Sequence, residues 1–553
     1  MPVAAWGFNG RVIAPARAIS AVGAAFRNEN VRRAELAWGA AIAAEWAHFV
    51  ALGVFAYHAG GTTAVGVAGL VRLLPAAFVA PFASSLGDRF RRERFLLTVT
   101  LVESAALAGS AAAAFANERV LVFAFAALVG LASTLFRPAL QALLPSLART
   151  CEELISSNGA TSTLESLGTL VGPLFAGALV SFANVGFVFV VGAGVLLIAA
   201  MLLARVRVED RVELGAPVAG DAGRMVLAGL RAVARTPRPR LLIGLVAAQC
   251  FVRGCLNVLI VVAVFRVFHE GAGAVGYLTA AIGVGGLLGA LAAMALEGRR
   301  LAVPFGLALV FWGVPIALVA PRPYFIAAVF LLAIVGAANS VEDVAVFTLL
   351  QRIVPDRLLA RVLGVLWGLA MAAVALGSIS APAIVAGIGT RSAFVVVGSI
   401  LPLLTFSTYR RLEEIDRTLV APTAELELID EVPMFAPLSL AAKERLATKL
   451  SPVAVAPGEL VIRAGDIGDR FYIVAGGELA IDANGVHSSA RAGDYFGEIA
   501  LLRDVPRTAT VEAVTDSDLY ALEREDFLAT ITGHPAAQTA ARAVADARLL
   551  SIT

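Results

Sequence analysis

Long apolar runs, separated by short polar segments, occupy the chain from residue 36 to about residue 409. A helix crosses about 30 Å of hydrocarbon with roughly 20 apolar residues, and most of these runs reach that length. They predict an α-helical membrane protein with twelve transmembrane helices in two six-helix halves. The predicted spans are residues 36–57, 63–86, 95–116, 119–142, 160–182, 184–204, 241–265, 273–296, 301–320, 324–349, 362–388 and 392–409.

The pattern changes in the last quarter of the chain. From 457 to 482, short apolar pieces alternate with glycine-centred turns, which predicts an antiparallel β-roll of jelly-roll type. The alanine-rich residues 536–550 predict a flanking helix. The expected parts are an N-terminal segment 1–35, a first half 36–204, an arginine-rich connector 205–240, a second half 241–409, a linker 410–432 and a β-roll domain 433–553.

Composition agrees with a membrane protein that spans the lipid bilayer. Of 553 residues, 59% are hydrophobic and only 16% are charged, and the mean hydropathy is +0.82. The formal net charge of +2 gives no indication of nucleic-acid binding. It conceals a division, because residues 1–420 carry a net charge of +11 and residues 421–553 a net charge of −9. A basic membrane region is therefore followed by an acidic domain.

Arginine distribution predicts the orientation of the spans. The loops after spans 2, 4, 6, 8 and 10 contain 18 arginines, whereas the opposite loops contain four. Cytoplasmic loops retain positive charge, so both termini are expected in the cytoplasm. We expect a multi-pass protein of the plasma membrane.

Residues 496–511, FGEIALLRDVPRTATV, contain the most distinctive chemistry of the chain. A short helix after Gly497 would direct free backbone N–H groups at an anion, and Arg507 would add a charged partner. Glu498 can accept a hydrogen bond from a ribose hydroxyl, and Pro506 stiffens the turn before the arginine. Together these residues suit a small cyclic phosphodiester.

This stretch resembles the phosphate-binding cassette of the cyclic-nucleotide-binding domain family, and the resemblance covers roughly residues 433–553. It implies a regulatory cyclic nucleotide and no metal. Thr508 leaves the base open: cAMP is favoured by analogy and cGMP is possible. The alternative is a roll that has lost its ligand. The implied nucleotide-binding residues are Phe496, Gly497, Glu498, Ile499, Ala500, Pro506, Arg507 and Thr508.

The loop after span 2, SSLGDRFRRERFL, resembles the G-x-L-a-D-R-x-G-R-R loop of the major facilitator superfamily, with Ser84 and Arg91 in place of its two glycines. The resemblance implies that Asp88 and Arg89 act in a conformational latch. The alternative is a plain positive-inside loop. Residues 350–365, LQRIVPDRLLARVLGV, are similar to a loop of macrolide-efflux-like exporters of this superfamily.

Span 5 contains GTLVGPLFAG, an arrangement similar to that of major facilitator antiporters. The resemblance implies efflux. The alternative is a simple helix-packing motif, because small residues let helices approach closely and proline bends a helix. Its motif residues are Gly168, Gly172, Pro173 and Gly177.

Polar and ionisable residues within the spans are candidates for transport and proton exchange, because each is costly to bury in lipid unless paired or hydrated. Glu45 and His48 share a helix face, which suits proton exchange or a cationic solute. Arg72 and Glu103 could instead form an internal pair, and a structural ion pair is an alternative for any of them. The full set is Glu45, His48, Arg72, Glu103, Glu165, Gln249, Arg253, Asn257, Glu342 and Asp343.

On span 7, Gln249, Arg253 and Asn257 form a polar stripe that would attract anions or pair with carboxylates of span 1 or span 10. Glu342 and Asp343 are adjacent in sequence and cannot both point the same way. At most one of them is expected to face the solute.

These observations predict a secondary active transporter that exports a small, largely apolar solute by proton antiport and is regulated by a cytoplasmic cyclic nucleotide. The sequence contains neither a phosphate loop for ATP nor an HExxH motif, so we do not expect an enzyme. The main alternative is a membrane-anchored cyclic-nucleotide receptor that signals without transport. Uptake differs only in direction, and the oligomeric state is left open.

Overall fold

The computed structural model separates the chain into two compact units, residues 1–350 with 354–416 and residues 351–353 with 417–553. The boundary at Asp416 lies within the predicted linker. The structure describes residues 26–79, 91–147, 151–207, 230–231, 233–294, 301–321, 324–354, 356–418, 423–438, 440–483, 485–532 and 535–552.

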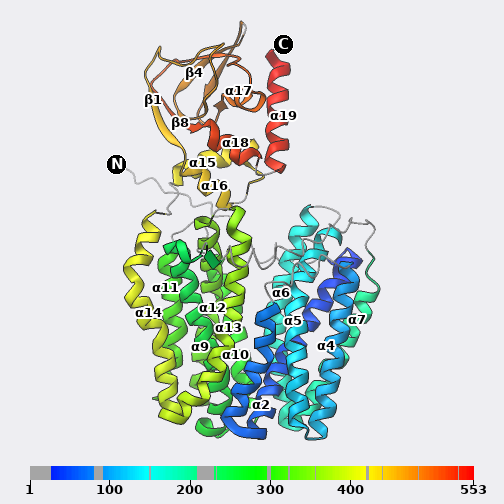
Figure 1. The fold of residues 1–553 in the computed structure, drawn as a ribbon. Coiled ribbons are helices and arrows are strands. Elements are labelled where there is room, and N and C mark those ends of the chain that lie inside the picture. The colour runs from blue at the N-terminus through cyan, green and yellow to red at the C-terminus, as the bar shows by residue number, and fades with distance from the viewer. Residues whose placement is uncertain are drawn as a thin grey trace, which may run out of the picture. The chain divides into compact units, whose positions relative to one another are not determined.

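The first unit is a bundle of long helices that run side by side (Figure 1). Each predicted span overlaps one of them over most of its length, because a long apolar run in lipid can satisfy its backbone only as a helix. Residues 80–86 and 295–296 of the predicted spans lie outside the described residues. The helices are α2 (Glu29–Val79), α4 (Arg92–Phe115), α5 (Arg119–Leu147), α6 (Cys151–Phe182), α7 (Val185–Ala204), α9 (Pro237–Ala263), which continues as a π-helical turn (Val264–Phe268), α10 (Gly273–Met294), α11 (Ala302–Leu318), α12 (Phe325–Ile353), α13 (Asp356–Ile388) and α14 (Thr390–Thr418).

Helix α2 contains the first two predicted spans. Its helical geometry is broken at Gly60 and Gly61, and Gly61 has φ +65°, which favours glycine. Among the described residues, ten helices are long and apolar enough to cross a membrane, with α2 counted once, and α11 is a shorter apolar helix of 17 residues. The membrane-helix class is thus confirmed, while the count of twelve crossings in two halves stays a prediction.

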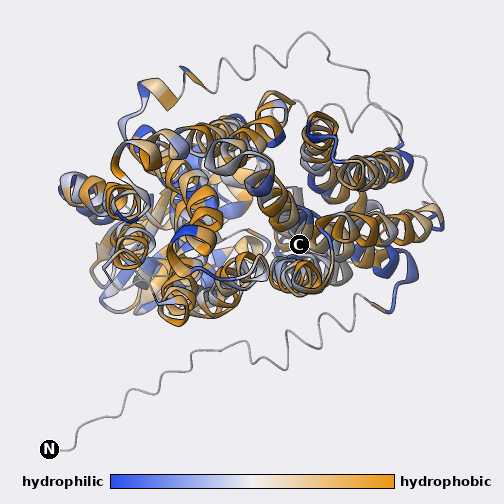
Figure 2. Cartoon of the chain, turned by 90° about the horizontal axis from the view of Figure 1, so that it is seen from below, coloured by the Kyte–Doolittle hydropathy of each residue, from blue (hydrophilic) through white to orange (hydrophobic). Residues whose placement is uncertain are grey.

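Hydrophobic residues cover most of the helix surfaces when the chain is seen from below (Figure 2). Large apolar side chains such as Phe182 and Phe406 are almost fully exposed. Soluble proteins rarely expose so much contiguous apolar surface, whereas lipid accommodates it.

Glycines let several helices approach one another closely. A Cβ at Gly285 of α10 would lie 1.7 Å from the carbonyl oxygen of Ala333 on α12. A Cβ at Gly177 of α6 would lie 2.7 Å from the carbonyl oxygen of Gly273 on α10. Backbone contact at this distance excludes every other residue type.

The second unit contains the predicted β-roll, made of two four-stranded antiparallel sheets ordered β1-β8-β3-β6 and β2-β7-β4-β5. The glycine-centred turns of the sequence connect its short strands. The strands are β1 (Ser451–Val455), β2 (Leu460–Ile462), β3 (Arg470–Gly476), β4 (Glu478–Ala483), β5 (Val486–Arg491), β6 (Tyr495–Phe496), β7 (Thr510–Ala513) and β8 (Ser517–Glu523).

Short helices flank the roll, and an aromatic cluster holds them together. Phe471 of β3 stacks on Phe527 with ring centroids 4.9 Å apart, and Phe435 contacts both rings edge-on. Ala537 and Ala541 of the last helix pack on the same core, so the predicted alanine-rich helix is present. The helices are α15 (Thr423–Glu431), a 3₁₀ turn (Pro433–Phe435), α16 (Leu440–Ala447), α17 (Glu498–Arg503), α18 (Arg524–Thr532) and α19 (Pro535–Ile552).

Adjacent glycines of α10 provide a matched test of this helix packing. We expect Gly285→Ala to destabilise the membrane unit by about 1–3 kcal/mol, because its Cβ would overlap the Ala333 carbonyl. Gly286→Ala should have little effect, because its Cβ would lie 3.5 Å from Ser340 Oγ, an ordinary van der Waals distance. Thermal unfolding of the purified full-length protein measures both, and equal midpoints would contradict the close α10–α12 approach.

Candidate functional site

The strand-to-helix connection after β6 forms the centre of the site in the β-roll. Gly497 precedes α17 with φ +94°, a left-handed conformation that favours glycine. A Cβ there would lie 2.6 Å from Nη1 of Arg507 and 3.0 Å from the carbonyl oxygen of Arg470. Glycine therefore lets the Arg507 guanidinium lie directly against the backbone.

Arg507 is buried to an unusual degree for an arginine, with 2% of its side chain exposed. Its Nη1 donates to the carbonyl oxygen of Gly497 at 3.1 Å, and its Nη2 donates to that of Arg470 at 2.7 Å. The anionic partner is Asp469 at 3.3 Å, whose side chain is 69% exposed. The guanidinium is thus held rigidly by neutral carbonyls and only weakly compensated in charge.

Glu498 is the second buried ionisable group of this site, with 1% of its side chain exposed. Arg548 of α19 donates to its Oε1 at 2.9 Å and to the carbonyl oxygen of Tyr495 at 2.8 Å. The same guanidinium lies 4.3 Å from the Tyr495 ring centroid. Burial raises the pKa of Glu498 above its ordinary value, while the positive charge of Arg548 opposes that rise.

The remaining predicted cassette residues surround these two groups. Phe496 stacks on Tyr472 with ring centroids 5.2 Å apart, and Ile499 and Ala500 are buried in α17. Pro506 is exposed and Thr508 is partly exposed. The structure thus brings together a buried guanidinium, a buried carboxylate and small backbone-exposing residues, which suits a ligand with one anionic group and a nearby hydroxyl.

Sequence reasoning missed two partners of this site. Asp469 lies in the quoted stretch 457–482, where its acidic side chain close to a strand was a usable signal. Arg548 lies 50 residues after Glu498 in an alanine-rich helix, and no sequence spacing links the two.

In the membrane unit, Arg72 pairs with Glu45 and not with Glu103. Arg72 Nη2 lies 2.7 Å from Glu45 Oε1, both on α2 but on opposite sides of its break. Glu103 of α4 instead contacts Ser133 of α5 at 2.9 Å. The predicted Arg72–Glu103 pair was therefore wrong, because the fold-back of α2 brings Glu45 within reach of the guanidinium. Glu45 is 28% exposed, whereas His48 is buried, so these two residues differ in their surroundings.

Glu165 of α6 forms a two-point ion pair with Arg137 of α5. Nη1 to Oε1 is 3.1 Å and Nη2 to Oε2 is 2.9 Å. Sequence reasoning missed Arg137, although an arginine inside a predicted span is itself an indication of a functional or paired residue. It also missed Glu35, a fully buried carboxylate that lies just before the first predicted span and accepts hydrogen bonds from Ser157 and Thr161.

Asn339 of α12 connects the polar groups of α9, α11 and α12. Its Oδ1 accepts from Gln249 at 3.3 Å and from the Trp312 indole at 3.2 Å, and its Nδ2 donates to Asp343 at 2.9 Å. Glu342 is buried while Asp343 is exposed, so the two point different ways.

The other residues of the α9 stripe are partly buried. Arg253 interacts electrostatically with both Glu342 and Asp343, as expected for a cation facing the span 10 carboxylates. Asn257 has intermediate exposure. The stripe therefore contacts α12 through Gln249.

The span 5 motif lies at helix contacts of α6. A Cβ at Gly168 would meet Ile42, and one at Gly172 would meet the Ala43 carbonyl oxygen at 2.5 Å, both on α2. Pro173 lies inside α6, and Gly177 contacts α10. Asp88 and Arg89 lie outside the described residues.

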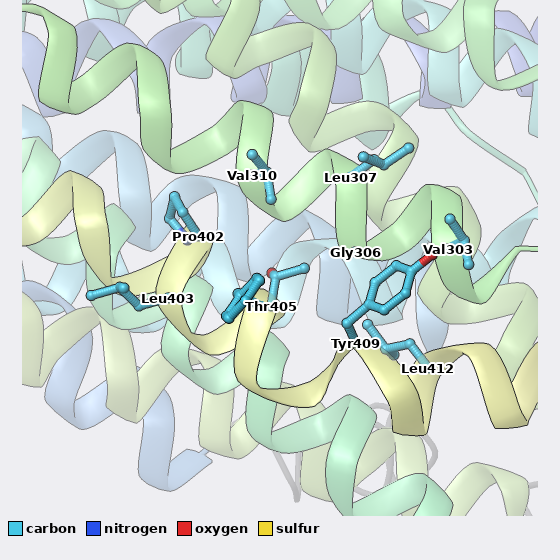
Figure 3. Close-up of a pocket in the computed structure, with 10 residues that line it drawn as sticks. Val303, Gly306, Leu307, Val310, Pro402, Leu403, Thr405, Tyr409 and Leu412 are labelled. Atoms are coloured by element: carbon cyan, nitrogen blue, oxygen red, sulfur yellow. The ribbon is translucent and has the colours of Figure 1, made fainter.

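A pocket of about 390 Å³ lies between α11 and α14 (Figure 3). Its lining is apolar apart from Thr405 and the Tyr409 hydroxyl, and none of the candidate transport residues reaches it. Among the described residues, no group of three or more His, Cys, Asp or Glu is placed to hold a metal ion.

Two families match the chain. The Major Facilitator Superfamily matches residues 36–370, which is more than half of the chain. The cyclic nucleotide-binding domain matches residues 452–534 and so includes the whole cassette. The macrolide-efflux branch of the first family stays a prediction.

Curated relatives match the C-terminal domain. The cAMP-dependent protein kinase regulatory subunit of Yarrowia lipolytica is 40% identical over 102 residues, which are 18% of this chain and 27% of the relative. That of Dictyostelium discoideum is 35% identical over 133 residues, 22% of this chain and 40% of the relative. The cyclic nucleotide-gated channel alpha-4 of Mus musculus is 37% identical over 131 residues, which are 22% of this chain and 23% of the relative. The chain therefore spans well under half the length of these relatives.

Solved structures match the same region. The regulatory domain of Toxoplasma gondii PKA with cAMP has 25% identity over 22% of this chain and 49% of that chain, with a TM-score of 0.21. The catabolite activator protein of Thermus thermophilus has 28% identity over 22% of this chain and 59% of that chain, with a TM-score of 0.20. The two family matches decide the assignment: the chain belongs to the Major Facilitator Superfamily and carries a C-terminal cyclic nucleotide-binding domain.

Proposed function

We propose that this protein is a secondary active transporter that exports a small, largely apolar solute in exchange for protons, and that cytoplasmic cAMP binding to its C-terminal domain regulates the exchange. Membership of the Major Facilitator Superfamily supports the transport of a small molecule. Proton coupling is supported by the ionisable side chains within the membrane helices.

The observation that carries the regulatory proposal is the buried guanidinium of Arg507. Burying a cation is costly unless an anion compensates it, and Asp469 is largely exposed to water. A cyclic phosphate would supply that charge beside Gly497, where the backbone is uncovered. Glu498 would accept the hydrogen bond of the ribose 2′-hydroxyl.

The choice of cAMP follows the relatives. Two of those described above are named cAMP-dependent, although a cyclic nucleotide-gated channel also matches. Thr508 offers a hydroxyl next to Arg507, so cGMP is the competing ligand that a binding experiment has to include.

The arrangement in the membrane completes the proposal. We place twelve crossings in two six-helix halves, 36–204 and 241–409, in the plasma membrane, with the segment 1–35, the connector 205–240, the linker 410–432 and the domain 433–553 in the cytoplasm. The arginine-rich loops support this orientation. It would put the nucleotide domain in the compartment that contains its ligand.

Two structural links support regulation. Arg548 of α19 donates to the same carboxylate that would hold the ribose, so nucleotide binding acts directly on the last helix. The linker 410–432 begins as the last part of α14, which extends as a helix to Thr418. Within it, Asp416 accepts hydrogen bonds from the backbone of Ala302 and Val303 at 2.7 and 2.9 Å, which fixes this part of the linker to the first turn of α11.

We expect Arg507→Ala to weaken cAMP binding by at least about a hundredfold, roughly 3 kcal/mol, because the phosphate loses its charged partner. Calorimetric titration of the full-length protein with cAMP and cGMP measures this. Arg491→Ala is the matched control, because that arginine is exposed and pairs with Glu478 on β4. Near-normal affinity in Arg507→Ala would refute the cassette assignment.

The pKa of Glu498 predicts a pH dependence of binding. The ionised carboxylate is the better acceptor for a ribose hydroxyl, and burial raises the pKa of Glu498. Affinity should therefore be constant above this raised pKa and decrease as the pH falls through it. Arg548→Gln should move that decrease to higher pH, because Arg548 holds the pKa down. Titrations across pH measure the shift, Glu498→Gln should remove the dependence, and a shift to lower pH in Arg548→Gln would contradict this role.

Transport and its regulation can be measured together in proteoliposomes that contain a pH-sensitive dye. We expect some member of a panel of small amphipathic compounds to drive proton movement in the direction opposite to its own, and cAMP to change the initial rate several-fold. Arg507→Ala should transport at the same rate with or without cAMP. Cyclic nucleotide binding without any solute-driven proton flux would favour the non-transporting receptor.

A further inference from the structure

Four ionisable side chains of α2 and α4 interact with one another and form a largely buried cluster: Glu45, His48, Arg72 and Glu103. Only the Arg72–Glu45 contact is an ion pair. Glu103 is 1% exposed, and its Oε2 has no hydrogen-bond partner among the described residues. His48, against the Phe189 ring, likewise has no partner for either nitrogen within the described chain. The cluster thus holds two carboxyl groups and one paired cation.

The hydrogen bonds of Ser133 indicate where a proton resides. Its Oγ lies 2.9 Å from Glu103 Oε1 and 2.9 Å from the carbonyl oxygen of Val129. A hydroxyl has one hydrogen to donate, and the Val129 carbonyl can only accept. If Glu103 carries a proton, it donates to Ser133 while Ser133 donates to Val129, and both contacts are satisfied. An ionised Glu103 would leave one of them without a hydrogen.

Charge balance leads to the same assignment. Arg72 neutralises Glu45, and both Glu45 and Arg72 interact electrostatically with Glu103. The hydroxyl of Ser133 adds a hydrogen bond to Glu103 but no charge. An ionised Glu103 would add an uncompensated negative charge to a buried site. Arg72 still has a free donor, because its Nε has no partner among the described residues.

We propose that Glu103 is the proton-binding residue of the transporter and that loss of its proton transfers Arg72 from Glu45 to Glu103. The O–H bond of Glu103 breaks, and the proton passes to water by way of the partly exposed Ser133 hydroxyl. Arg72 then gives up its hydrogen bond to the Glu45 carboxylate and donates a hydrogen bond to the Glu103 carboxylate instead. Glu45, which is 28% exposed, then loses its internal cation. It becomes available to a cationic group of the solute or to a second proton.

Packing supports such an exchange. A Cβ at Gly130 of α5 would lie 2.2 Å from the carbonyl oxygen of Arg72, so α5 contacts the backbone of Arg72 directly. Ser133 follows Gly130 by three residues, on the same face of α5. Ser133, which contacts Glu103, therefore lies one helical turn from the point where α5 packs against the backbone of Arg72.

This inference rests on the proposed proton coupling, but its test requires neither solute nor gradient. Infrared pH-difference spectroscopy on the full-length protein in lipid nanodiscs detects the C=O stretching band of a protonated carboxyl. We expect Glu103→Gln to lose a band that titrates in the wild-type protein. Glu342→Gln is the matched control, because Glu342 is equally buried but lies on α12, and that variant should retain the Glu103 band. If Glu103→Gln retained every pH-dependent C=O band of the wild-type protein, the proposal would be overturned.

Glu45→Gln tests the partner exchange. With Glu45 neutral, Arg72 is free to pair with Glu103, so the proton affinity of Glu103 should fall about tenfold or more and its band should titrate at lower pH. An unmoved or higher titration midpoint would show that Arg72 does not exchange partners.

Ser133→Ala keeps the assignment testable if Glu103→Gln does not fold. Removal of the hydroxyl should shift the frequency of the Glu103 band. An unshifted band would contradict the assignment of that band to the Glu103 carboxyl group. A band that behaves as expected in a protein without solute-driven proton flux would refute the proposed transport and leave the proton site standing.

Discussion

The cost of burying a charge constrains both units of this protein. An ionised side chain removed from water needs a partner of opposite charge or a set of oriented dipoles. Arg507 obtains dipoles from two backbone carbonyls and little negative charge, and Glu103 obtains one hydroxyl and no cation. The anionic partner of Arg507 is largely exposed to water, and Glu103 forms no ion pair within the described chain, so an anion beside Arg507 and a proton on Glu103 would each lower the cost of burial.

Glycine makes these incomplete sites possible, because it brings backbone to the charged group. At Gly497 the absence of a Cβ lets the Arg507 guanidinium contact the chain, and at Gly130 it lets α5 contact the backbone of Arg72 directly. A larger residue at either position would move the helix or the side chain by more than a hydrogen bond tolerates. The same residue type thus determines the geometry of a β-roll site and of a membrane site.

The sequence was sufficient to predict the helices, the β-roll and the position of the cassette, but not which side chains pair with one another. Apolar runs predict the helices because lipid leaves no alternative for the backbone, and even the break of α2 at Gly60 and Gly61 falls between two predicted spans. Arg72 was expected beside Glu103 because both lie within spans. Which carboxylate it meets depends on the depth and rotation of helices far apart in sequence. Arg548 and Glu498, 50 residues apart, escaped prediction for the same reason.

The energies involved favour graded regulation over an absolute gate. A ligand that binds one state tenfold more tightly shifts the equilibrium between two states by about 1.4 kcal/mol. That is the net contribution of one or two hydrogen bonds. The contacts of Arg548 with Glu498 and of Asp416 with the first turn of α11 involve charged groups, for which one hydrogen bond contributes about 1.5–3 kcal/mol. Rearranging one such contact would therefore be enough in magnitude to account for a tenfold preference between the two states.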